Sequence, residues 1–154
     1  MLSKNLSLAE VTRSATAKRL GIVNDPTEQH LENLKAVAED VFQPIREEFM
    51  CPIFVSSGYR SEALNDAIKG SSRSQHCRGQ ALDLDADVYG VITNADIFHY
   101  ILDNLDFDQL IWEYGTDKNP DWVHVSYHKG GKNRLQVFKA VSVGGETKYV
   151  PYEG

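Results

Sequence analysis

SSGYRSEALNDAIKGSSRSQHCRGQALDLDAD, residues 56–87, holds the pattern around which the rest of the chain can be interpreted. Its last part, residues 81–86, alternates between apolar and acidic side chains, as a strand with one buried face does. The small and polar residues 70–78 precede this strand and indicate a loop. The loop carries His76, and the strand carries Asp83 seven positions later. An imidazole and a carboxylate in this arrangement are candidates for one metal site.

A second histidine, His124, follows downstream in PDWVHVSYH, residues 120–128. If the strands that carry Asp83 and His124 are neighbours, these two side chains converge with that of His76. Two imidazoles and one carboxylate leave the fourth position of a tetrahedral zinc ion open to water, which is the arrangement of a catalytic zinc. We therefore predict that His76, Asp83 and His124 bind Zn²⁺.

The remaining histidines and the cysteine in the loop fit this site less well. His30 and His99 lie on expected helices with no acidic partner at ligand spacing. His128 shares a strand face with His124, but four residues of strand separate them by about 13 Å, which is too far for one ion. Cys77 neighbours the loop imidazole and points to the opposite face of an extended chain. We expect Cys77 to be a free thiol.

Hydrolysis at such a site also needs a base and a group that stabilises negative charge. Asp121, three residues before His124, is the candidate base, provided that the strand begins after Asp121. Pro120 makes such a break plausible. Arg60 is the candidate for the second role, or it holds a substrate carboxylate. A surface salt bridge is the alternative interpretation of Arg60.

Length and composition limit the class of protein. With 154 residues, 42% of them apolar and 25% charged, the chain is expected to form one soluble domain over residues 1–154. The formal net charge of −6 argues against nucleic acid as a partner. No apolar run of about 18 residues occurs, so we expect no membrane insertion. The N-terminal residues lack the pattern of a secretory signal, so we expect synthesis in the cytoplasm.

Helices are expected mainly in the first half of the chain. Ser7 begins a capping box for a helix that Gly21 ends. Asp25 and Pro26 are expected to cap and open a second helix, which Pro44 kinks or splits.

Strands are expected mainly in the second half. They cover residues 53–55, 81–86, 109–114, 122–127, 135–141 and 148–150. Ser61 and Asn94 are expected to cap two further helices. The expected fold class is α+β, in which N-terminal helices pack on a small antiparallel sheet that carries the zinc site.

These motifs resemble a known family. Residues 74–83, SQHCRGQALD, match in full the pattern S-x-H-x2-G-x-A-x-D. This pattern is the zinc signature of peptidase family M15, the D-Ala-D-Ala carboxypeptidases and murein endopeptidases. SGYRS at residues 57–61 and WVH at residues 122–124 also match the family, in the right order. The N-terminal half resembles the M15A-type subgroup often found in phages and prophages, so the resemblance covers most of the chain.

The resemblance implies a role for each site residue. The three predicted zinc ligands would keep that role, and Asp121 would be the general base where many relatives carry Glu. Arg60 would stabilise the scissile carbonyl or its tetrahedral intermediate, and Ser74 would hydrogen-bond the substrate near the metal. The implied fold is a small α+β unit with its zinc on an antiparallel sheet, as in Hedgehog-like and DD-peptidase-like domains.

We therefore expect a zinc metallopeptidase that hydrolyses peptide bonds of bacterial peptidoglycan stem peptides or crosslinks, as a carboxypeptidase or an endopeptidase. It would act as a monomer on the cell wall, as a phage endolysin released through a holin or as a virion-borne enzyme. One alternative is a 2-His-1-carboxylate Fe(II) oxygenase, which the helical first half disfavours. Another is a zinc-containing module that binds the wall without cutting it, which Asp121 and Arg60 disfavour.

Overall fold

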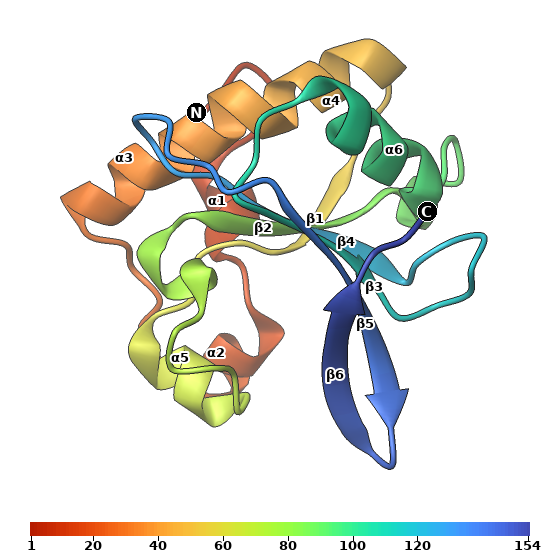
Figure 1. The fold of residues 1–154 in the computed structure, drawn as a ribbon. Helices are drawn as coiled ribbons and strands as arrows, with labels where there is room; N and C mark the ends of the chain where they lie inside the picture. Colours follow the sequence, from red (N-terminus) through yellow and green to blue (C-terminus); the bar gives the residue numbers. More distant parts are fainter.

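The computed structural model describes all of residues 1–154, and Figure 1 shows a central sheet with helices on both sides. The sheet has six strands in the order β1-β2-β4-β3-β5-β6. The strands are β1 (Phe54–Ser57), β2 (Ala81–Asp85), β3 (Gln109–Glu113), β4 (Trp122–Ser126), β5 (Gln136–Val143) and β6 (Glu146–Pro151). Helices come mainly first and the sheet follows, which confirms the predicted α+β class.

One pair of strands differs from the predicted antiparallel arrangement. β3 and β5 run parallel, whereas the other four neighbouring pairs are antiparallel. The reason is that β4 already occupies one edge of β3. Residues 127–135 carry the chain to the other edge of β3, so that β5 runs opposite to β4 and therefore parallel to β3.

The helices lie on both sides of this sheet. They are α1 (Leu8–Thr12), α2 (Ala15–Leu20), α3 (Glu28–Val37), α4 (Gln43–Phe49), α5 (Glu62–Ala67) and α6 (Asn94–Asn104), with a π-helical segment η1 (Ala38–Phe42) and 3₁₀ turns η2 (Gln75–Arg78) and η3 (Ala86–Tyr89). Figure 1 shows α3, α4 and α6 above the sheet and α2 and α5 below it, while the β5–β6 hairpin extends the sheet downwards. None of the helices is long and apolar enough to span a membrane.

The N-terminal helices begin and end at residues that satisfy their free backbone groups. Ser7 and Glu10 form the predicted capping box, and Gly21 ends α2 with φ +66°. The single helix predicted between them is wrong, because Arg13 is extended and Ser14 caps a new helix.

The long helical run of the first half also departs from the prediction at its start. Its first turn begins after Thr27 rather than at Asp25 and Pro26, because Thr27 forms a reciprocal capping box with His30. The expected disruption at Pro44 is confirmed, since the π-helical segment η1 separates α3 from α4 just before it.

The core lies on one face of the sheet and leaves the other face to the site. Leu82 and Leu84 of β2 are fully buried in the same cluster as Phe42 of η1 and Phe98 of α6. Because side chains alternate along a strand, this burial directs Asp83 to the opposite face.

Candidate metal and catalytic site

The face opposite the core carries a row of side chains from three neighbouring strands. Asp83 pairs with His124 across β2 and β4, and His124 pairs with Ile111 across β4 and β3. Residues that pair in this way place their side chains on the same face. An open cavity of about 780 Å³ lies over this row, and Asp83, Ile111, His124 and His76 are among its lining residues.

The three predicted metal ligands converge in this cavity. Asp83 Oδ1 lies 3.3 Å from His76 Nε2 and 3.1 Å from His124 Nδ1. One ligand atom from each residue lies within 4.8 Å of the other two. A single cation can therefore contact all three side chains, and only three protein ligands are available for it.

The imidazole of His76 is held in the form that a metal ligand requires. His76 is 2% exposed, and its Nδ1 lies 2.7 Å from the carbonyl oxygen of Gly58. A carbonyl only accepts, so Nδ1 carries the proton and Nε2 presents its lone pair to the cluster. Nε2 is buried and has no hydrogen-bond partner, because the 3.3 Å contact with Asp83 lacks hydrogen-bond geometry. This orphaned atom fits a site that is completed by a cation.

Burial and neighbouring charge favour the ligand forms of His76 and Asp83. Burial lowers the pKa of His76 and outweighs the neighbouring Asp83 carboxylate, which raises it, so the neutral imidazole is favoured. Burial alone would raise the pKa of Asp83, but the two neighbouring imidazoles of His76 and His124 hold it well below its usual range. A neutral imidazole and an ionised carboxylate are the forms that bind metals.

Two glycines of the matched motifs allow the segments around His76 to approach each other closely. A Cβ on Gly58 would lie 2.5 Å from the carbonyl oxygen of Val11. Gly79 has φ +74°, and a Cβ there would lie 2.6 Å from the carbonyl oxygen of His30. Each glycine is therefore required by the local backbone packing that positions the first metal ligand.

Glu113, which sequence reasoning missed, lies on the same face as the ligands. It follows Ile111 by two residues on β3, pairs with Trp122 of β4 and lines the cavity. Its side chain is only 6% exposed, and this burial raises its pKa to about 7. The only signal in the sequence is an acid in the otherwise apolar strand LIWE, and its face cannot be assigned without the strand register.

Asp121, the predicted base, lies outside the cavity. β4 begins at Trp122, as the prediction required, but Trp122 shares a face with His124 and Asp121 is exposed. Asp121 does not line the cavity. Its backbone N–H donates to the carbonyl oxygen of Glu113 at 2.9 Å, so the main chain of Asp121 supports the strand that carries Glu113.

Arg60 and Ser74 both line the cavity. Arg60 forms no ion pair, its Nε is buried without a hydrogen-bond partner, and its Nη1 donates to Asn65 Oδ1 at 3.4 Å. Ser74 is the N-cap of η2, and its Oγ accepts from the N–H of His76 at 3.3 Å. Cys77 is a free thiol outside the metal cluster, and burial raises its pKa.

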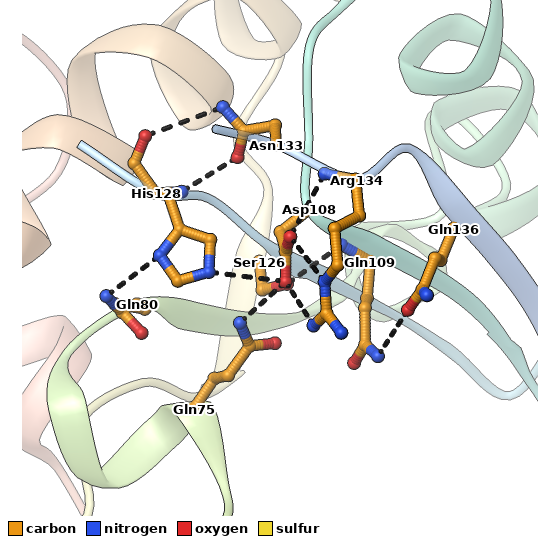
Figure 2. A network of polar contacts seen from close by, with 9 residues as sticks. All are labelled: Gln75, Gln80, Asp108, Gln109, Ser126, His128, Asn133, Arg134 and Gln136. Atoms are coloured by element: carbon orange, nitrogen blue, oxygen red, sulfur yellow. Dashed lines mark hydrogen bonds and ion pairs between the residues drawn. The ribbon is translucent and has the colours of Figure 1, made fainter. Parts of the chain in front are cut away.

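A second polar network lies beside the metal ligands, centred on Asp108 (Figure 2). The side chain of Asp108 is fully buried and accepts hydrogen bonds from Arg134 Nε at 2.9 Å, Arg134 Nη2 at 2.7 Å and Gln75 Nε2 at 2.9 Å. His128 Nε2 lies 3.5 Å from Asp108 Oδ2. His128 thus joins a structural network at the cavity wall, separate from the ion-binding cluster.

The fold and these side chains define an α+β domain with three convergent metal-ligand groups and a buried carboxyl group in one cavity. The family model described as Peptidase M15 matches residues 4–126, and the chain therefore belongs to the peptidase M15 family. The predicted M15A subgroup and phage origin are not tested by this match and stay predictions. Membership in a peptidase family favours hydrolysis over the oxygenase alternative.

Comparison with individual proteins adds one similarity. The crystal structure of the L-Ala D-Glu endopeptidase ChiX of Serratia marcescens is 24% identical in sequence, with a TM-score of 0.38. The alignment covers 67% of this chain and 89% of that chain. No curated protein sequence matches the chain.

Proposed function

We propose that this protein is a zinc peptidase that hydrolyses peptide bonds in bacterial peptidoglycan stem peptides or crosslinks. The observation that carries the proposal is the convergence of His76 Nε2, Asp83 Oδ1 and His124 Nδ1 in a cavity that also contains a buried carboxyl group. Nitrogen and oxygen donors of this kind suit Zn²⁺. When bound there, zinc would supply a more acidic water and a polarised substrate carbonyl.

The side chains around the ligands have complementary roles in this proposal. Glu113, and not Asp121, is the general base, because Glu113 lies in the cavity and its pKa near 7 suits proton transfer at neutral pH. Arg60 donates hydrogen bonds to the carbonyl oxygen as negative charge develops on it. Its buried and unpartnered Nε supports this role. Ser74 orients the peptide beside His76.

The match of residues 74–83 to the M15 zinc signature supports peptidoglycan as the substrate. We propose that residues 1–154 act as a single peptidase domain and as a monomer. The biological role in this proposal is lysis or remodelling of the bacterial cell wall, in the manner of a phage endolysin.

The experiment is incubation of purified sacculi with the zinc-loaded protein, followed by mass spectrometry of the soluble products. We expect new amino and carboxyl termini within stem peptides, and no products after chelation of the metal or with His124→Ala. His99→Ala is the matched control, because His99 lies on α6 and does not line the cavity. Zinc binding together with sacculus binding but without any released peptide would instead support the non-catalytic wall-binding module.

A further inference from the structure

The cavity that holds the proposed metal site has an unusual share of positive charge for an acidic protein. The chain carries a formal net charge of −6 and 16 lysine and arginine residues. Four of these residues line the cavity, and all four are arginines: Arg60, Arg73, Arg78 and Arg134. The only acids in the lining are Asp83, which is a proposed metal ligand, and Glu113.

Most of this positive charge has no partner within the protein. Arg60, Arg73 and Arg78 form no ion pair. Arg134 pairs with Asp108 through Nε and Nη2, which leaves its Nη1 without a partner in a side chain that is 53% exposed. A guanidinium presents donors in a planar fork that matches a carboxylate, and a lysine ammonium does not. Of the anions that a guanidinium fork matches, a peptide substrate offers carboxylates, so these arginines fit a carboxylate of the substrate.

The sheet register places these groups relative to the metal ligands. Gln109 pairs with Gln136 of β5, and Gln109 lies two residues before Ile111 on β3, so it belongs to the next row on the cavity face. Two residues of strand span about 7 Å. Glu113 lies two residues after Ile111 on β3. The proposed base Glu113 and Gln109 therefore lie on opposite sides of the row formed by Asp83, His124 and Ile111.

Arg134 and the η2 turn lie close to each other, next to Gln109. Figure 2 shows Gln75 and Arg134 directed at the same carboxylate of Asp108, next to Gln109. Gln75 is the first residue of η2 and Arg78 is its last, so this contact brings the turn to the same end of the cavity. Gln75 Oε1 is buried without a hydrogen-bond partner. It can accept from a peptide N–H at the place where the guanidinium groups face the substrate.

Resting on the proposed function, we propose that Arg73, Arg78 and Arg134 form a carboxylate-binding subsite one residue away from the scissile bond. The subsite selects peptides in which the residue next to that bond carries a free carboxylate. The rise of about 7 Å between the two rows matches the distance from a scissile carbonyl to a carboxylate on an adjacent substrate residue. Arg60, on the side of the metal ligands, remains available to the scissile carbonyl.

Two synthetic stem peptides test this proposal, and they differ only in the carboxyl group of the residue next to the bond that mass spectrometry of the sacculus products identifies as cleaved. One carries the free carboxylate, and the other carries the isosteric carboxamide. For the zinc-loaded wild type we expect kcat/KM to be about 10-fold higher with the carboxylate, through KM rather than kcat, because a charge-assisted hydrogen bond is lost with the amide. The preference should shrink as NaCl is raised, since exposed charges are screened.

Variants assign the preference to the arginines. Arg73→Gln combined with Arg78→Gln should bring the ratio of the two kcat/KM values close to one. Both side chains are exposed, so the double variant keeps the fold. Arg19→Gln, an exposed arginine on α2 outside the cavity, is the control and should keep the wild-type ratio.

Calorimetric titration of both peptides into zinc-loaded Glu113→Gln separates this proposal from the proposed function. Tighter binding of the carboxylate peptide supports the subsite even if the wild type cleaves neither peptide, in which case the proposed function alone fails. Equal binding of the two peptides, or equal cleavage of both by the wild type, overturns the subsite and leaves the proposed function standing.

Discussion

Asp83 and His124 lie directly opposite each other on β2 and β4, with Asp83 Oδ1 3.1 Å from His124 Nδ1. This pairing fixes two of the three proposed ligands on neighbouring strands in the interior of the sheet. Only His76 reaches the cluster from a turn, and its hydrogen bond to the carbonyl oxygen of Gly58 restrains it. The cluster is thus largely formed before an ion binds.

The first prediction concerns metal binding itself. Zinc at 100 times its dissociation constant should raise the free energy of unfolding of the wild type by about 2.7 kcal/mol, because it binds the folded chain. Asp83→Ala removes the ligand that bridges both histidines, and we expect the zinc-dependent increase to disappear. Thermal unfolding with and without zinc measures this. Asp66→Ala, on the exposed side of α5, should respond to zinc as the wild type does.

The second prediction distinguishes Glu113 from Asp121 as the base. Glu113→Gln should lower kcat by a factor of about 10² to 10⁴, the usual range for loss of a general base, without abolishing zinc binding. Asp121→Ala should stay within about three-fold of the wild type, because its side chain is exposed outside the cavity. Single-turnover rates with a defined muropeptide provide the comparison. The reverse order of the two effects would return the role to Asp121.

The contrast between Glu113 and Asp121 shows which parts of the proposed site could be predicted from the sequence. The three proposed ligands could be assigned from the sequence because S-x-H-x2-G-x-A-x-D joins a turn to one strand and WVH supplies the second histidine. The proposed base Glu113 could not, because the face on which it lies depends on the register between β3 and β4. Spacing before His124 pointed to Asp121, but the alternation of β4 directs Trp122, and not Asp121, to the cavity face.

In the fold, too, features set by local contacts could be predicted from the sequence, and features set by non-local contacts could not. Caps such as Ser7 and Ser61 could be predicted because their hydrogen bonds lie within one turn of the chain. The parallel pairing of β3 with β5 could not, because it depends on which edge of β3 was already occupied. The contact of Asp108 with Arg134 could likewise not be predicted, because it depends on the crossover from β4 to β5 that brings Arg134 to Asp108.

The third prediction concerns the stability of the metal-free protein as pH changes. Glu113 has a folded-state pKa of about 7, raised from 4.5 chiefly by burial. Between these values the folded state binds more protons than the unfolded state, so this group lowers stability as pH rises. The shift corresponds to about 3 kcal/mol that is lost between pH 4.5 and pH 7.

Urea unfolding of the metal-free wild type and of Glu113→Gln at pH 5 and pH 8 isolates this contribution. Burial lowers the pKa of His76, which changes stability in the opposite direction, but that effect is present in both proteins and cancels in the difference. We expect Glu113→Gln to gain about 3 kcal/mol relative to the wild type on going from pH 5 to pH 8. The exposed Glu146→Gln on β6 should show no such gain, and a flat difference for Glu113→Gln would mean that its carboxyl group is solvated.

The fourth prediction concerns the network around Asp108, which ties the end of β5 to the cavity wall. Burial alone would raise the pKa of Asp108, but hydrogen bonds from Arg134 and Gln75 outweigh it and hold the pKa well below the usual range. Asp108→Asn replaces one acceptor oxygen by a donor that faces the Arg134 guanidinium. We expect a loss of about 1 to 3 kcal/mol in the free energy of unfolding, because the buried carboxylate loses hydrogen bonds whereas its partner Arg134 is half-exposed.

The same carboxylate gives this effect a pH dependence of defined sign. Because its folded-state pKa is depressed, the stability that Asp108 contributes is present above its unfolded pKa of 3.8 and is lost as pH falls below it. The difference between wild type and Asp108→Asn should therefore shrink from pH 7 to pH 3. Asp106→Asn, two residues earlier and exposed, is the matched control and should be neutral at both pH values. If Asp108→Asn also lowers kcat/KM at a temperature where it is fully folded, the network positions the cavity wall as well as stabilising the fold.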